Sequence, residues 1–188
     1  MDLAQETDER LMQRVSAGER PALSILLRRY ANPLLTFLRR MSGHHHRSEE
    51  LFQEVFVTVW SSSRSYQYPR PFRAWLFGIA ANKCHSERRR RYVATVPFDE
   101  EKSTVLAGRE LGPVEGAILV KTATLIEQAV MCLPVQQRKI VVMRVWNEFS
   151  YAEIARILER DESTVRSNMF HALASLRRIL EPRLRSSC

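Results

Sequence analysis

The sequence predicts an all-α protein, made of two small helical domains that are joined by an extended linker, with a helix-turn-helix in the C-terminal domain. Glycine is scarce, at 6 of 188 residues, and most stretches place apolar residues three and four positions apart, which is the period of an amphipathic helix. That period lapses between Tyr92 and Gly116, where proline, glycine and acidic residues gather. We therefore predict domains at residues 1–92 and 117–188, and a linker at residues 93–116.

The N-terminal half predicts four helices. The first stops at Gly18, and the second begins after Pro21 and is either interrupted or followed by Asn32-Pro33. A loop rich in serine, tyrosine and arginine, residues 61–70, separates the last two helices. The first, third and fourth helices are expected at residues 8–17, 48–60 and 71–91.

The C-terminal half contains a helix-turn-helix pattern. Ser150 and Glu153 have the spacing of a capping box, in which the serine hydroxyl accepts from a free N–H at the helix start and the glutamate reaches back. The short helix that follows ends in a turn at residues 159–161, where Asp161 is placed to cap a longer helix. The four helices of this half are expected at residues 117–133, 136–146, 151–158 and 162–180, with Ile154, Ala155 and Leu158 facing inward.

The longer helix has two faces. Phe170 lies in the middle of the polar face, where it could meet a thymine methyl in a DNA major groove while Arg166 reaches a guanine edge or a phosphate. The alternative is an ordinary amphipathic helix whose Phe170 packs on a neighbouring domain. The inward stripe is predicted to hold Val165, Met169, Ala172, Leu173, Leu176 and Leu180, and the other face Ser163, Arg166, Ser167, Phe170, His171, Arg177 and Arg178.

Composition and charge limit the class of partner. Lysine and arginine number 29 against 21 acidic residues, a net charge of +8, which favours a polyanionic partner, either nucleic acid or an anionic membrane. No apolar run approaches the ~20 residues of a membrane-spanning helix, and the acidic N-terminus has no apolar secretory core. We expect no membrane insertion and a cytoplasmic location. The three cysteines lack C-x-x-C spacing, so we predict reduced thiols, no metal and no cofactor.

The helix at residues 48–60 carries an acidic face. Glu50, Gln53 and Glu54 share one side, which indicates a positively charged protein partner or, alternatively, an ordinary solvated helix face. The opposite, apolar face is predicted to hold Leu51, Phe52, Val55, Phe56, Val59 and Trp60.

Aromatic residues alternate with arginines after this helix. Aromatic rings stack on unpaired bases while arginines hold the backbone, so the pattern indicates single-strand binding. The alternative is core packing, which we favour for Trp75. The aromatics are Tyr66, Tyr68, Phe72 and Trp75, and the arginines are Arg64, Arg70 and Arg73.

These motifs together resemble the extracytoplasmic-function (group four) sigma factors, over about residues 9–180. Those proteins carry an acidic-x-x-Gln-Glu-x-Phe helix, and then a Phe-x-x-Trp-Leu-x-x-Ile-Ala-x-Asn helix that ends in arginines. Their C-terminal half carries Leu-Pro, Arg, a Glu-Ile-Ala helix and Thr-Val-Lys/Arg-Ser. The matching residues are Glu50, Gln53, Glu54, Phe56, Phe72, Trp75, Leu76, Ile79, Ala80, Asn82, Arg88–Arg91, Leu133-Pro134, Arg138, Glu153-Ile154-Ala155 and Thr164-Val165-Arg166-Ser167.

The resemblance implies a subunit without covalent chemistry, which gives core RNA polymerase promoter specificity and opens the duplex. It implies that Glu50, Gln53 and Glu54 dock on the clamp helices of the β′ subunit, that the β flap and promoter DNA are further partners, and that an anti-sigma factor regulates the chain. The melted −10 element would be bound by Arg64, Tyr66, Tyr68, Arg73, Asn82, Arg88, Arg89 and Arg90. The duplex −35 element would be read by Ser163, Thr164, Arg166, Ser167, Phe170 and His171.

The chain departs from the family pattern at four positions, and the departures concern mainly the upstream base preference. Glu159 and Ser163 stand where the family often has glycine, and His171 and Leu173 where it has arginine. The acidic linker would thread through the polymerase as family linkers do, or act as a solvated tether.

Two other functions compete with this interpretation. A stand-alone helix-turn-helix regulator with a helical sensor domain explains the C-terminal half, but it leaves the motifs of the N-terminal half unexplained. A metal-dependent nuclease would need His44–His46, Cys84 and His85, but three adjacent histidines cannot all face one ion, and no carboxylate stands at ligand spacing. We therefore predict that His44–His46 are exposed loop residues without a metal.

Overall fold

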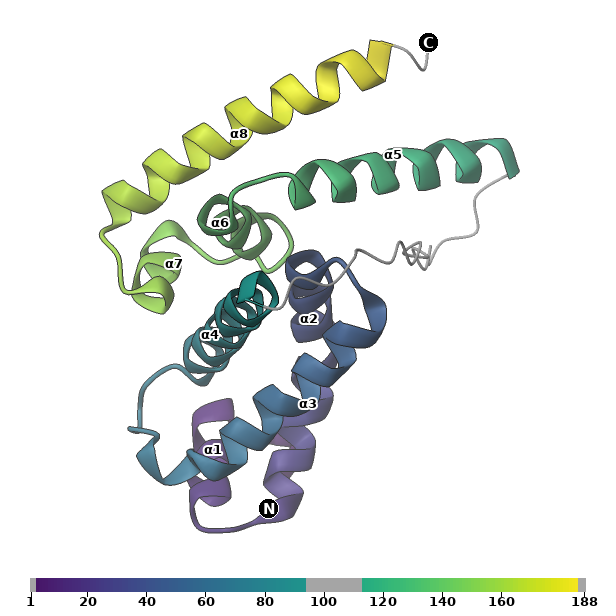
Figure 1. Ribbon diagram of the computed structural model, residues 1–188. Helices are drawn as coiled ribbons and strands as arrows, with labels where there is room; N and C mark the ends of the chain where they lie inside the picture. Colours follow the sequence, from purple (N-terminus) through teal and green to yellow (C-terminus); the bar gives the residue numbers. More distant parts are fainter. Residues whose placement is uncertain (1–2, 94–112, 186–188) are drawn as a thin grey trace.

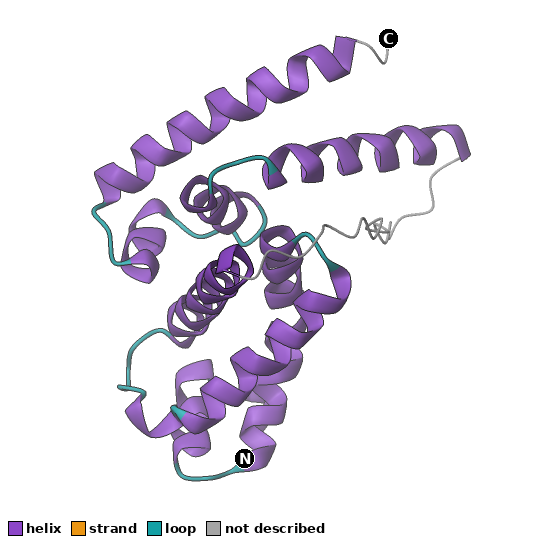
Figure 2. Cartoon of the chain, in the orientation of Figure 1, coloured by secondary structure: helices purple, strands orange, loops and turns teal. Residues whose placement is uncertain are grey.

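The structure is a computed structural model that describes residues 3–93 and 113–185, with side chains described for residues 3–86 and 122–182 (Figure 1). All the regular elements in the described parts of the chain are helices, so the predicted all-α class is confirmed (Figure 2). Most of the predicted linker, residues 94–112, lies outside the described residues. The helices are η1 Leu3–Gln5, α1 Asp8–Ser16, α2 Arg20–Ser42, α3 His45–Ser61, η2 Ser63–Ser65, α4 Phe72–Val93, α5 Pro113–Met131, α6 Val135–Val145, α7 Tyr151–Leu158 and α8 Glu162–Arg185.

Helices α1 to α4 pack together in the N-terminal half (Figure 1). Thr7 caps α1, and its side chain accepts from the backbone N–H of Arg10. Tyr30 donates to Asp8 across α1 and α2 at 2.5 Å, and burial together with Asp8 raises the pKa of this tyrosine. The apolar core of this half includes Leu11, Met12, Leu26, Leu34, Phe37, Leu51, Val55, Phe72, Leu76 and Phe77.

Two helix boundaries differ from the sequence-based prediction. Helix α2 continues through Pro33, because buried residues on both sides of the proline, such as Leu26 and Phe37, hold its two parts against the same core. Helix α3 begins at His45 rather than Ser48, with His44 at the N-cap position. The predicted histidine loop is therefore wrong for His45 and His46, which lie exposed in the first turn of α3 and each face a glutamate four residues on.

The helix-turn-helix forms as predicted from its capping box. Ser150 Oγ accepts from the N–H of Glu153 at 3.2 Å, and Glu153 Oε2 accepts from the N–H of Ser150 at 2.8 Å. These hydrogen bonds stabilise the carboxylate and lower the pKa of Glu153. Ile154 and Ala155 are buried as expected, Leu158 is half-buried, and Ile157 adds a buried residue that the pattern did not single out.

The turn between α7 and α8 is built on a residue with a left-handed backbone. Glu159 has φ 53°, ψ 52°, and its N–H donates to Ala155 O to close the end of α7. Left-handed backbone costs a residue with a Cβ about 1 kcal/mol, a cost that glycine avoids. The glycine that the resembled family often has in this turn would suit this geometry.

We expect Glu159→Gly to raise the free energy of unfolding by about 0.5–1 kcal/mol, because it removes this strain and offsets the greater freedom of the unfolded chain. Urea denaturation followed by circular dichroism measures the change. The control is Arg160→Gly, at a position whose φ is not positive, where glycine should destabilise the protein. Equal effects of the two substitutions would contradict the assignment of strain to residue 159.

The two halves share one continuous apolar core in the described residues. Helix α6 contacts α2, and α7 contacts α4 (Figure 1). Phe77 of α4 and Phe149, which follows α6, meet edge to face with ring centroids 5.0 Å apart. The halves that the sequence treats as separate domains are therefore in direct contact in this structure, while their boundaries remain a prediction.

Candidate nucleic-acid interface

The first half of α8 presents one face to solvent. Phe170 is 70% exposed, which argues against the alternative that it packs on a neighbouring domain. Val165, Met169 and Ala172 are buried on the opposite side, as predicted. The exposed residues of the face are Ser163, Thr164, Arg166, Ser167, Phe170 and His171.

Leu173 does not face inward as predicted. Its side chain is 52% exposed, because it lies at the edge of the buried stripe, about 60° from Phe170 around the helix axis. Leu176 and Leu180, nearer the centre of the stripe, are half-buried. Phe170 and Leu173 therefore form an exposed apolar pair, three residues apart, within an otherwise polar and basic face.

Arg166 is held at the start of α8 by contacts within its own half. Its guanidinium donates to Glu162 Oε1 at 2.5 and 2.9 Å and lies 4.6 Å from the ring centroid of Tyr151. The pair with Glu162 is exposed, and such pairs are worth little. A phosphate or a guanine edge could therefore replace the glutamate at small cost.

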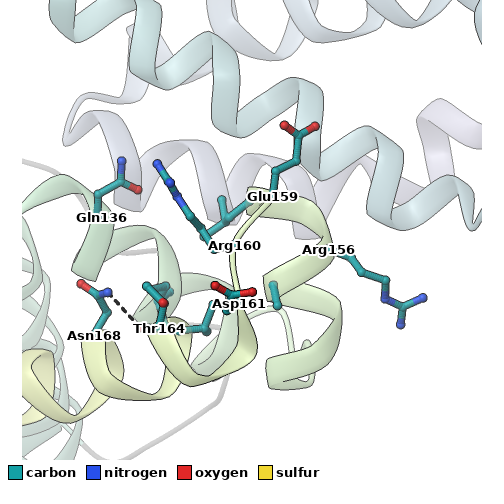
Figure 3. A pocket seen from close by; sticks show the side chains of 11 residues that line it. Gln136, Arg156, Glu159, Arg160, Asp161, Thr164 and Asn168 are labelled. Carbon is teal, nitrogen blue, oxygen red and sulfur yellow. Dashed lines mark hydrogen bonds between the residues drawn. The ribbon is translucent and has the colours of Figure 1, made fainter.

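A polar hollow lies behind this face, between α6, the end of α7 and the start of α8 (Figure 3). Its volume is about 690 Å³. Gln136, Asp161, Thr164 and Asn168 line it, and the Asn168 amide donates to Thr164 O at 2.9 Å. The side chain of Arg156 points away from the hollow (Figure 3). The hollow is part of the helix-turn-helix, and its rim adjoins the exposed face of α8.

A second exposed surface lies along α3, and it is less acidic than the sequence suggests. Arg47 pairs with Glu50 at 2.5 Å and with Glu54 at 3.2 Å, and Lys83 lies 3.7 Å from Glu54. Gln53 is exposed. The two glutamates are therefore partly neutralised by basic residues of the same half.

Two apolar residues on this surface were missed. Val57 is 67% exposed, and Trp60, which was predicted to lie inward, is 37% exposed. The buried face of α3 is narrower than predicted and follows Leu51, Val55 and Val59, because four-residue steps keep these three on one line. The spacing i, i+4, i+7 of Gln53, Val57 and Trp60 could have revealed a shared exposed face.

The two tyrosines of the loop between α3 and α4 have different environments. Tyr66 is 9% exposed, packs against Trp75 with ring centroids 5.2 Å apart, and donates its hydroxyl to Arg70 O. Burial raises the pKa of Tyr66 to about 12. Tyr68 is 50% exposed. In this conformation only Tyr68 has a ring that a base could reach, so the prediction that both rings stack on bases does not fit the placement of Tyr66.

The remaining predicted strand-binding residues lie in different settings. Arg64 and Asn82 are exposed. Arg73 is not free, because its guanidinium donates to Asn147 O and lies 4.1 Å from the ring centroid of Phe149. Trp75 is half-buried against Tyr66 and Phe72, in agreement with the core interpretation. The side chains of Arg88–Arg90 lie outside the described residues.

Groups that could carry other chemistry were also sought among the described residues. That part of the chain holds no group of three or more histidine, cysteine or acidic side chains placed to bind a metal ion. Cys84 is a buried free thiol and Cys132 an exposed one. No described helix is both long and apolar enough to cross a membrane.

Two family descriptions match the chain, one in each half. "Sigma-70 region 2" matches residues 26–92, which contain α3 and the aromatic loop. "Sigma-70, region 4" matches residues 123–176, which contain the helix-turn-helix. An all-helical chain with both regions in this order has the architecture of an RNA polymerase sigma factor.

Relatives cover nearly the whole chain. The ECF RNA polymerase sigma factor SigM of Mycobacterium tuberculosis strain Erdman is 30% identical over 166 residues, which are 87% of this chain and 80% of SigM. The RNA polymerase sigma-H factor of Pseudomonas aeruginosa is 26% identical over 192 residues, 98% of this chain and 100% of that protein. The chain therefore belongs to the ECF RNA polymerase sigma factors.

Solved structures show the same fold. CnrH, solved in complex with the cytosolic domain of CnrY, superposes with a TM-score of 0.72 at 22% identity, covering 94% of this chain and 99% of CnrH. The sigma factor RpoE of Bartonella quintana, solved with the anti-sigma factor NepR, gives a TM-score of 0.68 at 23% identity, covering 82% and 94% of the two chains. The protein is an alternative sigma factor, and the stand-alone regulator is excluded because it does not account for region 2.

Proposed function

We propose that this chain recruits core RNA polymerase through α3 and the promoter through α8 and the loop before α4, and that it performs no covalent chemistry itself. The observation that carries the proposal is the bare face of α8 around Phe170, since a 70% exposed phenylalanine among DNA-binding residue types calls for a ligand. The chain would act in the cytoplasm, where promoter DNA and polymerase meet.

The proposed polymerase surface is the exposed side of α3. Glu50, Gln53 and Glu54 supply its polar part, and the clamp helices of the β′ subunit are the proposed partner. Val57 and Trp60, which are exposed on the same helix, would add apolar area that aromatic and aliphatic contacts can bury. The β flap is a further proposed contact, for the C-terminal half.

The proposed −10 surface is centred on Tyr68, whose exposed ring can stack on an unpaired base. Arg64 and Asn82 are exposed and available for backbone and base contacts. Tyr66 would support the loop from inside rather than touch DNA, and Arg73 would contribute only after leaving Asn147. Arg88, Arg89 and Arg90 extend the surface as proposed phosphate contacts.

The proposed −35 surface is the exposed face of α8. Arg166 would exchange Glu162 for a guanine edge or a phosphate, and Phe170 would meet thymine methyl groups. Leu173 adds exposed apolar area next to Phe170, where the family usually has arginine. Ser163, Thr164, Ser167 and His171 complete the proposed −35 contacts.

We further propose an anti-sigma factor as a regulatory partner. CnrH and the Bartonella RpoE were both solved in complexes, the latter with a protein that is named as an anti-sigma factor. A chain of the same fold offers such a partner comparable surfaces.

We expect Gln53→Lys/Val57→Lys to weaken binding to core polymerase by at least about tenfold, because two new charges would have to be buried in the interface. Fluorescence anisotropy of the labelled chain with purified core enzyme measures the affinity, and run-off transcription reports the activity. These positions are preferable to Glu50 and Glu54, whose replacement would also break ion pairs with Arg47.

The matched control is Gln13→Lys/Ala17→Lys, which places the same charges with the same four-residue spacing on exposed positions at α1. It should bind core polymerase like the unmodified chain. Equal affinities of the two double variants would remove α3 from the polymerase interface. A lack of run-off transcription by the unmodified chain across a promoter library would argue against the proposed function as a whole.

A further inference from the structure

The segment between α6 and α7 joins the two halves of the molecule. Phe149 is fully buried, and its ring meets that of Phe77 edge to face. The guanidinium of Arg73 lies 4.1 Å from the ring centroid of Phe149 and donates to Asn147 O. This segment, residues 146–149, therefore holds the side chain that the proposed −10 surface would need in the N-terminal half.

Polar contacts reinforce this junction on the side of α2. The Asn147 amide donates to Pro33 O at 2.9 Å and is 2% exposed. The Arg40 guanidinium lies 4.4 Å from the ring centroid of Trp146 and 3.7 Å from Glu127 Oε1. Each contact joins a residue of the N-terminal half to one of the C-terminal half. The alignment of the halves is thus specified by directional interactions as well as by apolar packing.

The same junction carries costs that only the closed arrangement has. Asn147 Oδ1 is buried without a hydrogen-bond partner among the described residues, and an unmet buried acceptor is destabilising. Lys139 of α6 is almost fully buried, and this burial lowers its pKa. An interface that combines apolar packing with such unmet polar groups resembles a transient contact rather than a permanent core.

We propose that residues 146–149 form an intramolecular latch that holds Arg73 away from the melted DNA strand until the two halves separate. This inference rests on the proposed function, because it assigns a regulatory state to the same −10 surface. The Arg73 guanidinium cannot lie over Phe149 and contact a DNA backbone at the same time. The free chain would therefore bind single-stranded DNA poorly, and opening of the latch would release the surface.

The test uses the full chain with Arg40→Ala/Asn147→Ala, which removes two latch contacts and leaves Arg73 in place. The matched control is Arg14→Ala/Asn168→Ala, which removes the same residue types from contacts within one half. Small-angle X-ray scattering measures the radius of gyration. Anisotropy with a pool of short fluorescent single strands measures strand binding, and circular dichroism checks the fold.

We expect the latch variant to have a larger radius of gyration and to bind single strands roughly tenfold more tightly, because each lost contact shifts the closed-to-open ratio several-fold. The control should match the unmodified chain in both readouts. A variant that stays compact, or one that expands without gaining strand affinity, would overturn the proposal. If the variant loses helical content, Arg40→Ala alone, at a partly exposed position, replaces it with the same expected direction.

A second comparison separates the latch from the proposed function. Adding Arg73→Ala to the latch variant should remove most of the gained strand affinity if Arg73 contacts the strand. If that affinity persists, the latch does not act through Arg73, and the proposal in this form fails. Core-polymerase binding through α3 is measured independently and does not depend on either outcome.

Discussion

Alanine at Tyr68 should slow promoter opening by about tenfold and leave the free energy of unfolding unchanged, whereas alanine at Tyr66 should destabilise the fold by about 3 kcal/mol. Tyr68 is half-exposed, so its ring is available to stack on an unpaired base, an interaction worth ~1–3 kcal/mol. Tyr66 packs against Trp75 and Phe72, and its removal would leave a cavity in an aromatic core. Permanganate reactivity of unpaired thymines measures opening, and urea denaturation measures stability.

Two controls make this prediction specific. Tyr66→Phe keeps the ring and loses only the hydrogen bond to Arg70 O, so it should cost far less stability than Tyr66→Ala. A promoter with a pre-melted bubble should restore the activity of Tyr68→Ala, because the DNA no longer has to be unpaired. A Tyr68→Ala variant that opens duplex promoters at the normal rate would move the strand-capturing role away from this loop.

Removal of the Arg138 guanidinium should have the largest effect on stability, a loss of about 3 kcal/mol or more. Arg138 is buried, and it donates to Met41 O at 3.1 Å, to Leu133 O at 3.2 Å and to Met131 O. These carbonyls lie at the ends of α2 and α5, where backbone acceptors lack partners within the helix and a positive charge is favourable. In Arg138→Ala the acceptors would lose their buried donor.

Urea denaturation of Arg138→Ala, Arg138→Lys and the unmodified chain measures this effect. Lysine keeps the charge but not the planar fork, so it should recover only part of the stability. The control is Arg156→Ala on α7, where the arginine is exposed and bonds only to Ala152 O within its own helix, at 3.4 Å. If Arg138→Ala unfolds at the same urea concentration as this control, the triple cap contributes nothing.

The helix-turn-helix could be predicted almost completely, because its determinants are local. Ser150 and Glu153 specify the start of α7 through their own side chains, and α8 shows its buried and exposed faces in its three- and four-residue spacing. Phe170 stood out as an apolar residue on a polar face, and the structure leaves it exposed. Leu173, at the edge of the stripe, was misplaced because periodicity cannot show how wide a neighbouring helix is.

The N-terminal surface was harder to predict, because its residues take their positions from tertiary contacts. Nothing in the alternation of Tyr66 and Tyr68 shows which ring turns inward; the choice depends on Trp75, which lies on another helix. Trp60 was placed inside because large aromatic residues usually are. Arg73 was assigned to DNA because no sequence pattern links it to Asn147, which is 74 positions away.

Arg138 brings a pre-organised side chain to the junction between the halves. Leu133 and Met131 belong to its own half, and their carbonyls hold its guanidinium in place. Met41 O, at the end of α2, is the acceptor from the other half. When the halves meet, this hydrogen bond orders no new rotamer, so little conformational entropy is lost. When they part, water can take the place of the arginine at Met41 O while the cap on α5 remains. The halves can therefore dock repeatedly in the same alignment without either one rearranging.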